Sequence, residues 1–197
     1  MPDSQEMKLS EENTFSDEEI IEAEENLNLE EVAQIFGESS DLEDFEKRLN
    51  DPESKISNFD LNGDGEVDYL KVVEKVEGDT RTVYVQATVT ENKNKTVASI
   101  VVVKDSNNEV NVKVVGDEAL YGSNYIIIPA YMRVPTVVIW FWGPRYSVWV
   151  SPYRLGYYPS YFRPRAVFIR PRPAVGKTTV IRTSPRPVRK RTVIIRN

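Results

Sequence analysis

The feature that most constrains the fold is a change of hydrophobic period near residue 67. Between residues 67 and 116 lie four segments with strand character, separated by short polar runs: apolar and polar residues alternate in three of them, and TVASIVVVK is a run apolar enough to be a central strand. In the second segment, for example, Val83, Val85 and Ala87 share one face. Alternation places every second side chain on the same face of a strand, and short polar links join strands into hairpins. The sequence therefore predicts an antiparallel meander of four strands.

Two short helices are predicted ahead of the meander. Apolar residues recur at helical spacing over 29–36, and again over 42–49 behind a capping box that begins at Ser40. A sheet with one apolar face needs cover, and these helices supply it. The predicted fold class is therefore α+β, with short N-terminal helices packed on an antiparallel β-meander of four or five strands, followed by an irregular Pro/aromatic/Arg-rich C-terminal region.

The composition changes after about residue 119, where Pro, Tyr, Trp and Arg dominate. Residues 137–142 are apolar enough for one further strand, whereas prolines break the remainder into extended or turn segments. We therefore expect four parts: an acidic, largely disordered lead (1–27), an α+β core domain (28–142) that contains an acidic loop (60–71), an aromatic, Pro- and Arg-rich extension (143–170) and a basic flexible tail (171–197).

The expectation of a flexible tail rests on prolines and charge. Five prolines lie between residues 163 and 187, and each removes a backbone donor, so that no continuous ladder or helix can pass through. The many arginines around them repel one another and favour extension. One alternative stays open, because the β-branched pieces at 178–181 and 192–195 could each join the sheet as an edge strand.

Composition excludes several kinds of chemistry. The chain has no cysteine and no histidine, which rules out disulfides, thiolate metal sites, cysteine nucleophiles and a Ser-His-Asp triad. The stretch VGKTT at 175–179 ends like a phosphate-binding loop, but Pro171 occupies the position where that loop needs glycine. Paired carboxylates of the glycosidase type remain possible in principle, yet no pair stands out among 31 acidic residues. We therefore expect that the protein is not an enzyme.

The acidic loop has the ligand spacing of an EF-hand. Asp60, Asn62, Asp64, Glu66 and Asp68 occupy positions 1, 3, 5, 7 and 9, where side-chain oxygens and the carbonyl of position 7 bind the ion. Alternate positions matter because the chain wraps the ion, and hard oxygen ligands suit Ca²⁺. The sequence therefore predicts Ca²⁺ as the cofactor and these five residues as its ligands.

Two features depart from an EF-hand. Position 12 is Lys71 where a bidentate Glu is usual, and strand periodicity follows the loop in place of helix periodicity. Such loops resemble those that precede strands in integrin-type propellers and related secreted modules, where the position-9 aspartate binds directly. The alternative is a metal-free turn, since Asn62-Gly63 and Asp64-Gly65 are strong turn formers. With three charged ligands we expect weak affinity, with a Kd of ~10⁻⁴–10⁻³ M.

Charge is divided sharply along the chain. Residues 1–118 hold all 31 acidic residues and 11 of the 25 basic ones, whereas residues 119–197 hold the other 14. A polyanionic polymer, such as an envelope polymer or a nucleic acid, is one possible partner of the basic half, through Arg145, Arg154, Arg163 and Arg165. The alternative is that these arginines neutralise the acidic half of the same molecule while the aromatic rings cover the sheet. Contact of residues 140–142 with a membrane interface is a third possibility.

Three stretches occur in an order that is typical of one family: EDFEKRLNDPESKISNFDLNGDGEVDYLKVVEKVEG, then VVGDEALYGSNYIIIP, then FWGPRYSVWVSPYRLGYYP. Over about residues 40–165 the chain resembles a family of small, uncharacterised Bacteroidota proteins that are usually made with signal peptides. The resemblance implies an envelope or secreted location and a single calcium loop. It implies no activity, and it leaves the basic tail unexplained.

The location follows from two further observations. No run approaches ~20 apolar residues, so no transmembrane segment is predicted. The first residues, MPDSQEMKLS, lack the basic and apolar pattern of a signal peptide, so either the protein is cytoplasmic or the chain begins after a removed signal. A weak calcium site would be filled outside the cell, which favours the second alternative. We therefore expect a non-catalytic, calcium-binding periplasmic, envelope-associated or secreted protein with a structural or binding role, and a polyanion-binding module as the alternative.

Overall fold

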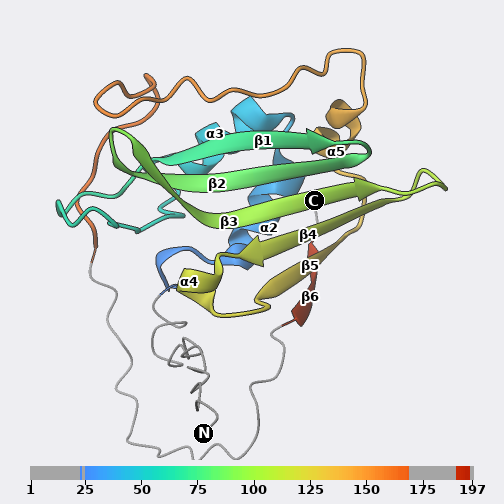
Figure 1. Ribbon diagram of the computed structural model, residues 1–197, viewed down its shortest axis with the longest axis horizontal. Helices are drawn as coiled ribbons and strands as arrows, with labels where there is room; N and C mark the ends of the chain where they lie inside the picture. Colours follow the sequence, from blue (N-terminus) through green and yellow to red (C-terminus); the bar gives the residue numbers. More distant parts are fainter. Residues whose placement is uncertain (1–22, 24, 169–189, 196–197) are drawn as a thin grey trace, which may run out of the picture.

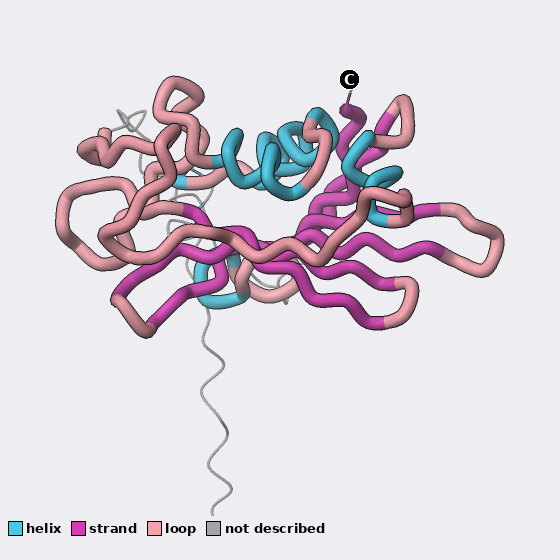
Figure 2. Tube along the Cα trace, turned by 90° about the horizontal axis from the view of Figure 1, so that it is seen from above, coloured by secondary structure: helices cyan, strands magenta, loops and turns pink. Residues whose placement is uncertain are grey.

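A computed structural model describes residue 23 and residues 25–168 and 190–195 of the chain. The described part contains one six-stranded sheet with the spatial order β1-β2-β3-β4-β5-β6, and the larger helices gather on one side of it (Figures 1 and 2). The strands are β1 (Leu70–Glu77), β2 (Thr80–Thr90), β3 (Lys93–Lys104), β4 (Val110–Gly116), β5 (Ile126–Tyr131) and β6 (Lys190–Ile195). The helices are α2 (Leu29–Glu38), α3 (Leu42–Leu49), α4 (Glu118–Tyr121) and α5 (Thr136–Phe141).

The predicted meander is present. Strands β1 to β4 pair antiparallel in sequence order, and Val72 of β1 lies opposite Val85 of β2. The alternating residues Val83, Val85 and Ala87 are fully buried against the helices. An α+β architecture with helices on one face of an antiparallel meander is therefore confirmed, with six strands where four or five were expected.

Both N-terminal helices form, with one cap displaced by a residue. Asn28 caps α2 by accepting a hydrogen bond from the Glu30 amide at 2.8 Å. Helix α3 is capped by Asp41, whose carboxylate accepts from the Asp44 amide at 2.8 Å, and not by Ser40 as the capping-box pattern predicted. Asp44 in turn accepts from the Ser40 amide at 3.0 Å, so the reciprocal box is shifted by one position.

The strand expected over residues 137–142 is wrong, because this segment is α5. Pro135, with φ of −58°, precedes the helix, where its fixed dihedral suits a helix start. Val137, Val138 and Phe141 are buried, and their spacing fits one side of a helix. The alternation of a strand and the stripe of a helix are hard to distinguish in a run of six apolar residues.

Residues at both ends of the chain depart from the expected division. Strand β6 lies within the expected flexible tail, yet it pairs in parallel with β5, as the edge-strand alternative for residues 192–195 anticipated. Ile195 is buried in the main core. At the other end, the expected disordered lead includes Leu27, which is fully buried, and the Tyr121 hydroxyl donates to the Leu27 carbonyl at 2.6 Å. Residues 169–189, which hold most of the expected tail, and residues 1–22 lie outside the described residues.

The extension follows the outer edge of β1 (Figure 1, orange). An isolated antiparallel bridge joins Val150 to Val73 of β1, and a second bridge joins Ala166 to Glu66 in the acidic loop. The extension therefore covers the edge of the sheet that would otherwise expose unpaired backbone groups.

A fully buried carboxylate, that of Glu46 on α3, holds the extension to the core. Its Oε1 accepts from the Tyr69 hydroxyl at 2.6 Å and from the Ser151 hydroxyl at 2.7 Å. Its Oε2 accepts from the Val72 amide at 2.9 Å and from the Trp149 indole at 3.2 Å. Four donors from two segments, residues 69–72 and 149–151, thus converge on one side chain of α3, which offsets the large penalty for burying a charge.

A second carboxylate fixes the start of the extension. Glu74 of β1 accepts from the Tyr146 hydroxyl at 2.7 Å and from the Trp149 amide at 2.9 Å. The guanidinium of Arg81 lies 5.3 Å from the ring centroids of both Trp142 and Tyr146, so the adjoining aromatic residues enclose a cation. Residues 142–149 are therefore bound to the sheet by charge-assisted contacts as well as by apolar packing.

Replacing Glu46 by Gln should destabilise the fold. An amide group takes the place of one acceptor oxygen, so that buried donors lose their partner, at a cost of about 1–3 kcal/mol for each unsatisfied group. We expect the free energy of unfolding, measured by urea titration, to fall by at least about 2 kcal/mol.

The matched control is Glu43→Gln, an exposed position on the same helix, which should change the free energy of unfolding by less than about 0.5 kcal/mol. Equal, small effects of the two substitutions would show that the Glu46 carboxylate does not hold the extension.

Candidate functional site

The acidic loop connects α3 to β1, and glycines allow its tight course. Gly63 has a φ of +77° and Gly65 a φ of +85°, a region that other residues rarely adopt. A Cβ atom at either position would meet no other atom within 4 Å. The glycines are therefore required by the backbone conformation and not by lack of space.

The side chains at loop positions 1, 3 and 5 accept hydrogen bonds from the backbone of the loop. The Asp60 carboxylate accepts from the Gly63 amide at 2.7 Å, the Asp64 amide at 3.1 Å and the Gly65 amide at 2.9 Å. The Asn62 side chain accepts from the Asp64 amide at 2.9 Å. Asp64 accepts from the backbone amide of Glu66 at 2.8 Å. The loop is thus folded around its own predicted ligands.

Asp68, at position 9, turns back toward the start of the loop. Its carboxylate accepts from the Leu61 amide at 2.6 Å, and the residue is only 6% exposed. Burial raises the pKa of Asp68 to about 6, and the negative charges of Asp60 and Asp64 add to the rise, whereas the bond from Leu61 opposes it. Three carboxylates therefore lie close enough to repel one another.

The extension pairs with the back of the loop. The Val67 amide donates to the Arg165 carbonyl at 2.8 Å, and the Val167 amide donates to the Gly65 carbonyl at 3.1 Å. In an antiparallel pair bonded in this way, the residue between them directs its own amide and carbonyl away from the partner strand. The Glu66 carbonyl, predicted as the position-7 ligand, is therefore directed away from the extension.

The oxygen atoms of the loop are of the type that binds calcium, but they are not arranged around a common point. A carboxylate offers about four lone-pair sites, and the described contacts of Asp60, Asp64 and Asp68 leave some of them unused. Within the described ranges, no group of three or more acidic side chains is arranged to hold a metal ion as it lies. Calcium binding would therefore require these carboxylates to rotate toward a common point. Lys71, at position 12, belongs to β1.

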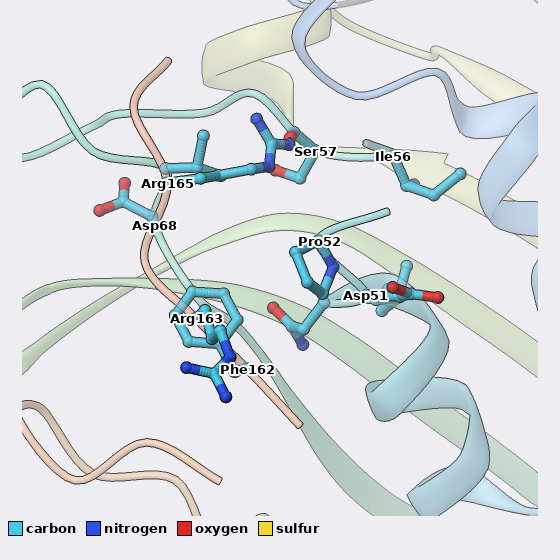
Figure 3. A pocket seen from close by; sticks show the side chains of 11 residues that line it. Asp51, Pro52, Ile56, Ser57, Asp68, Phe162, Arg163 and Arg165 are labelled. Atoms are coloured by element: carbon cyan, nitrogen blue, oxygen red, sulfur yellow. The ribbon is translucent and has the colours of Figure 1, made fainter. Parts of the chain in front are cut away.

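The space behind the loop is closed to ligands. A hollow of about 10 Å³ lies between the end of α3, the loop and the extension (Figure 3). Asp68, Ser57 and Arg165 are among its lining residues, and the Arg165 guanidinium donates to the Ser57 carbonyl. This volume holds at most about one water molecule. An ion would therefore reach the loop from its solvent side, where Asn62 and Asp64 are exposed.

Aromatic side chains of the extension stand next to the acidic loop. Tyr153 stacks on Tyr69, with ring centroids 4.1 Å apart, and on Tyr158 at 5.7 Å. Burial raises the pKa of Tyr158, and the negative charges of Glu66, Asp64 and Asp68 contribute to the rise. The Tyr158 hydroxyl therefore lies within the electrostatic field of the loop.

The four arginines predicted to bind a polyanion differ in their availability. Arg145, Arg154 and Arg163 are exposed, and none of them forms an ion pair with an acidic side chain among the described residues. Arg165 is half-buried, donates to the Ser57 carbonyl and lies 5.2 Å from the centroid of the Phe168 ring. Arg165 is thus engaged within the chain, while the other three face solvent.

The aromatic run at 140–142 faces the protein interior. Phe141 is buried, and Trp140 and Trp142 are half-buried and pack against the main core. Lys104 also lies 5.5 Å from the centroid of the Trp142 ring. Contact with a membrane interface is therefore not favoured for this run. No helix in the described part of the chain is long and apolar enough to cross a membrane.

Glu46 and Glu74, which position the extension beside the loop, were missed by the sequence analysis. The signal for Glu46 was present, because positions 42, 45, 46 and 49 fall on one face of α3 and the other three are apolar. An acidic residue on an apolar helix face indicates a buried hydrogen-bonded carboxylate. Glu74 also occupies the inward-facing side of β1, together with Leu70 and Val72.

Comparison of the chain with protein families, with curated proteins and with solved structures finds no match. The resemblance to the Bacteroidota family therefore stays a prediction.

The raised pKa of Asp68 predicts a specific pH dependence. In the unfolded chain the group titrates near 3.8, and in the folded chain near 6, so folding takes up protons between these values. In the absence of calcium, the charge of Asp68 opposes folding above about pH 6. Asp68→Asn should therefore melt at a higher temperature than the wild type at about pH 7.5 in EDTA.

This advantage should shrink as the pH falls through 6 toward 4, because Asp68 then becomes neutral in the wild type. The measurement is the difference in Tm between the two proteins across this range. A variant that is less stable than the wild type by the same amount at every pH would contradict the assignment.

Proposed function

We propose that this chain is a non-catalytic, calcium-binding protein of the periplasm, envelope or extracellular space, and that the ion stabilises the junction between α3, the sheet and the extension. The observation that carries the proposal is the proximity of Asp60 and Asp64 to Asp68 in the loop. Burial raises the pKa of Asp68, and the negative charges of Asp60 and Asp64 add to the rise. A divalent cation would offset this repulsion, which otherwise opposes folding.

The backbone supports the same proposal. The pairing of Gly65 and Val67 with the extension directs the Glu66 carbonyl away from the extension, as a position-7 ligand requires. Asn62 adds a side-chain oxygen at position 3. The ligand set is then Asp60, Asn62, Asp64, the Glu66 carbonyl and Asp68, and each ligand offers a hard oxygen.

The expected affinity supports a location outside the cytoplasm. Three carboxylates without a bidentate Glu correspond to the weak sites of extracellular modules, with a Kd of ~10⁻⁴–10⁻³ M. Such a site fills only where calcium is millimolar. The role we propose is therefore structural or binding, with calcium holding the loop on which the extension is anchored.

Calcium should raise the thermal stability of the full chain. At about 10-fold excess over the Kd, which millimolar Ca²⁺ gives for a Kd of ~10⁻⁴ M, binding adds roughly 1.4 kcal/mol to the free energy of unfolding. We expect Tm to rise between EDTA and millimolar Ca²⁺, and we expect Asp64→Ala to abolish the rise because it removes the position-5 ligand.

The control is Asp105→Ala in the β3–β4 turn. Asp105 also accepts backbone hydrogen bonds, from Asn107 at 2.8 Å and Glu109 at 2.9 Å, but it lies outside the acidic loop. Its removal should lower Tm in EDTA and leave the calcium response intact. A wild-type Tm that is the same in EDTA and in Ca²⁺ would refute the proposal.

A second candidate function is polyanion binding by the extension, and the exposure of Arg145, Arg154 and Arg163 favours it. Tyr157, which is 78% exposed, stands near Arg154 in a short turn where the Tyr157 amide donates to the Arg154 carbonyl at 2.8 Å. Guanidinium groups pair with phosphate or sulfate oxygens, and an exposed ring stacks on bases or sugars. Neutralisation of the acidic half through direct ion pairs is not supported for these three arginines.

If this surface binds polyanions, the full chain should bind heparin with a steep dependence on salt. Replacing both Arg154 and Arg163 by Ala should weaken binding and reduce the slope of log K against log [salt] by about 2. The control is Arg133→Ala, an exposed arginine outside the extension. A double variant that binds as tightly as the control would exclude this surface.

A further inference from the structure

The two edge strands of the sheet differ in whether another segment covers them. The extension covers the outer edge of β1, where Val150 bridges to Val73. Strand β6 forms the opposite edge (Figure 1), and none of the described residues pairs with its outer side. Natural proteins usually blunt an open edge with proline, bulges or inward charges. The final residues of β6, from Thr192 to Ile195, are all β-branched, which favours strand pairing.

A groove runs beside this open edge. It has a volume of about 610 Å³, within the range of roughly 300–1,000 Å³ that is common for binding clefts. One wall is the exposed side of α2, and the other is the C-terminal half of β6. The lining residues are Asn28, Glu30, Glu31, Gln34, Val193, Ile194 and Ile195.

The groove combines an acidic wall with an apolar strand edge. Glu30 and Glu31 lie on the α2 wall, and Ile194 of β6 is 69% exposed. Met132, which is 68% exposed, adjoins the end of β6, because its amide donates to the Ile195 carbonyl at 3.3 Å. The chemistry that fits is an extended strand with β-branched side chains and a basic end.

We propose that the occupant of this groove is β6 of a second copy of the chain, paired antiparallel to form a symmetric dimer with a continuous sheet. Strand β6 has the required composition, since it begins with Lys190-Arg191 and continues with β-branched residues. An antiparallel strand pair of this kind is self-complementary, as a twofold interface requires. Each strand supplies the edge that the other strand needs.

The distribution of charge selects the antiparallel direction. The acidic wall lies beside Val193, Ile194 and Ile195, at the end of β6 remote from its basic start. An antiparallel copy brings the start of its own strand, Lys190-Arg191, to this end, next to the exposed Glu31. A parallel copy would place the basic residues of both strands side by side, which is unfavourable.

The test is the oligomeric state of the full chain, measured by sedimentation velocity over a concentration series. We expect a monomer–dimer equilibrium whose dimer dissociation constant rises as salt is added. Ile194→Lys and Glu31→Lys should each raise the dimer dissociation constant by about tenfold or more, because each places a cation opposite the basic end of the second strand. Both positions are exposed in the single chain, so the variants should fold, which circular dichroism can verify.

Two matched controls make the same chemical changes elsewhere. Ile139→Lys alters an exposed isoleucine on α5, and Glu43→Lys alters an exposed glutamate on α3. Both should dimerise like the wild type. Since the chain has no cysteine, Thr192→Cys should also give a disulfide-linked dimer on oxidation, whereas Lys75→Cys on β1 should not.

A chain that stays monomeric at every concentration overturns the proposal. A dimer that the Ile194→Lys and Glu31→Lys variants do not weaken beyond their controls also overturns it, because that dimer uses another surface. Binding of a basic peptide from another protein to a monomeric chain would be evidence for a different occupant.

Discussion

The arrangement of the molecule depends on one buried charge, the Glu46 carboxylate. It sits on the apolar face of α3 and accepts hydrogen bonds from Tyr69 and Val72 at the start of the sheet and from Trp149 and Ser151 in the extension. An ionised group is tolerated in such a place only when its oxygens are satisfied. The hydrogen bonds of this single side chain therefore fix the helix, the sheet edge and the extension relative to one another.

The acidic loop gains its shape from the same arrangement. Because Glu46 and Glu74 hold the extension against β1, its later residues return to the loop and pair with Gly65 and Val67. This pairing orients the Glu66 carbonyl, while the Asp60 carboxylate accepts hydrogen bonds from the amides of residues 63, 64 and 65. The proposed calcium site thus belongs to the packing of the whole domain and not to a local turn alone. Calcium binding would strengthen the pairing between the loop and the extension, which covers the edge of β1.

The sequence predicted the meander, both helices and the glycine turns of the loop, since each follows from local period or backbone preference. It could not distinguish helix from strand over 137–142, where six apolar residues fit either and only tertiary packing decides, such as that of Phe141 against Phe36 of α2. The path of the extension could not be predicted from the sequence either, because it depends on hydrogen bonds between Glu46 and residues more than a hundred positions away. Strand β6 was anticipated only as an alternative, because its partner β5 lies far back in the chain and pairs in parallel.

The most direct test is a crystal structure of the full chain grown with calcium, with anomalous diffraction measured at the loop. We expect one anomalous peak with oxygens of Asp60, Asn62, Asp64 and Asp68 and the Glu66 carbonyl at roughly 2.3–2.6 Å from it. The carboxylates should have turned inward from their present hydrogen bonds, while the pairing of residues 65–67 with the extension is kept. A loop without a peak, in which Asp60 and Asp64 still accept hydrogen bonds only from backbone and side-chain amides, would contradict calcium binding at this loop.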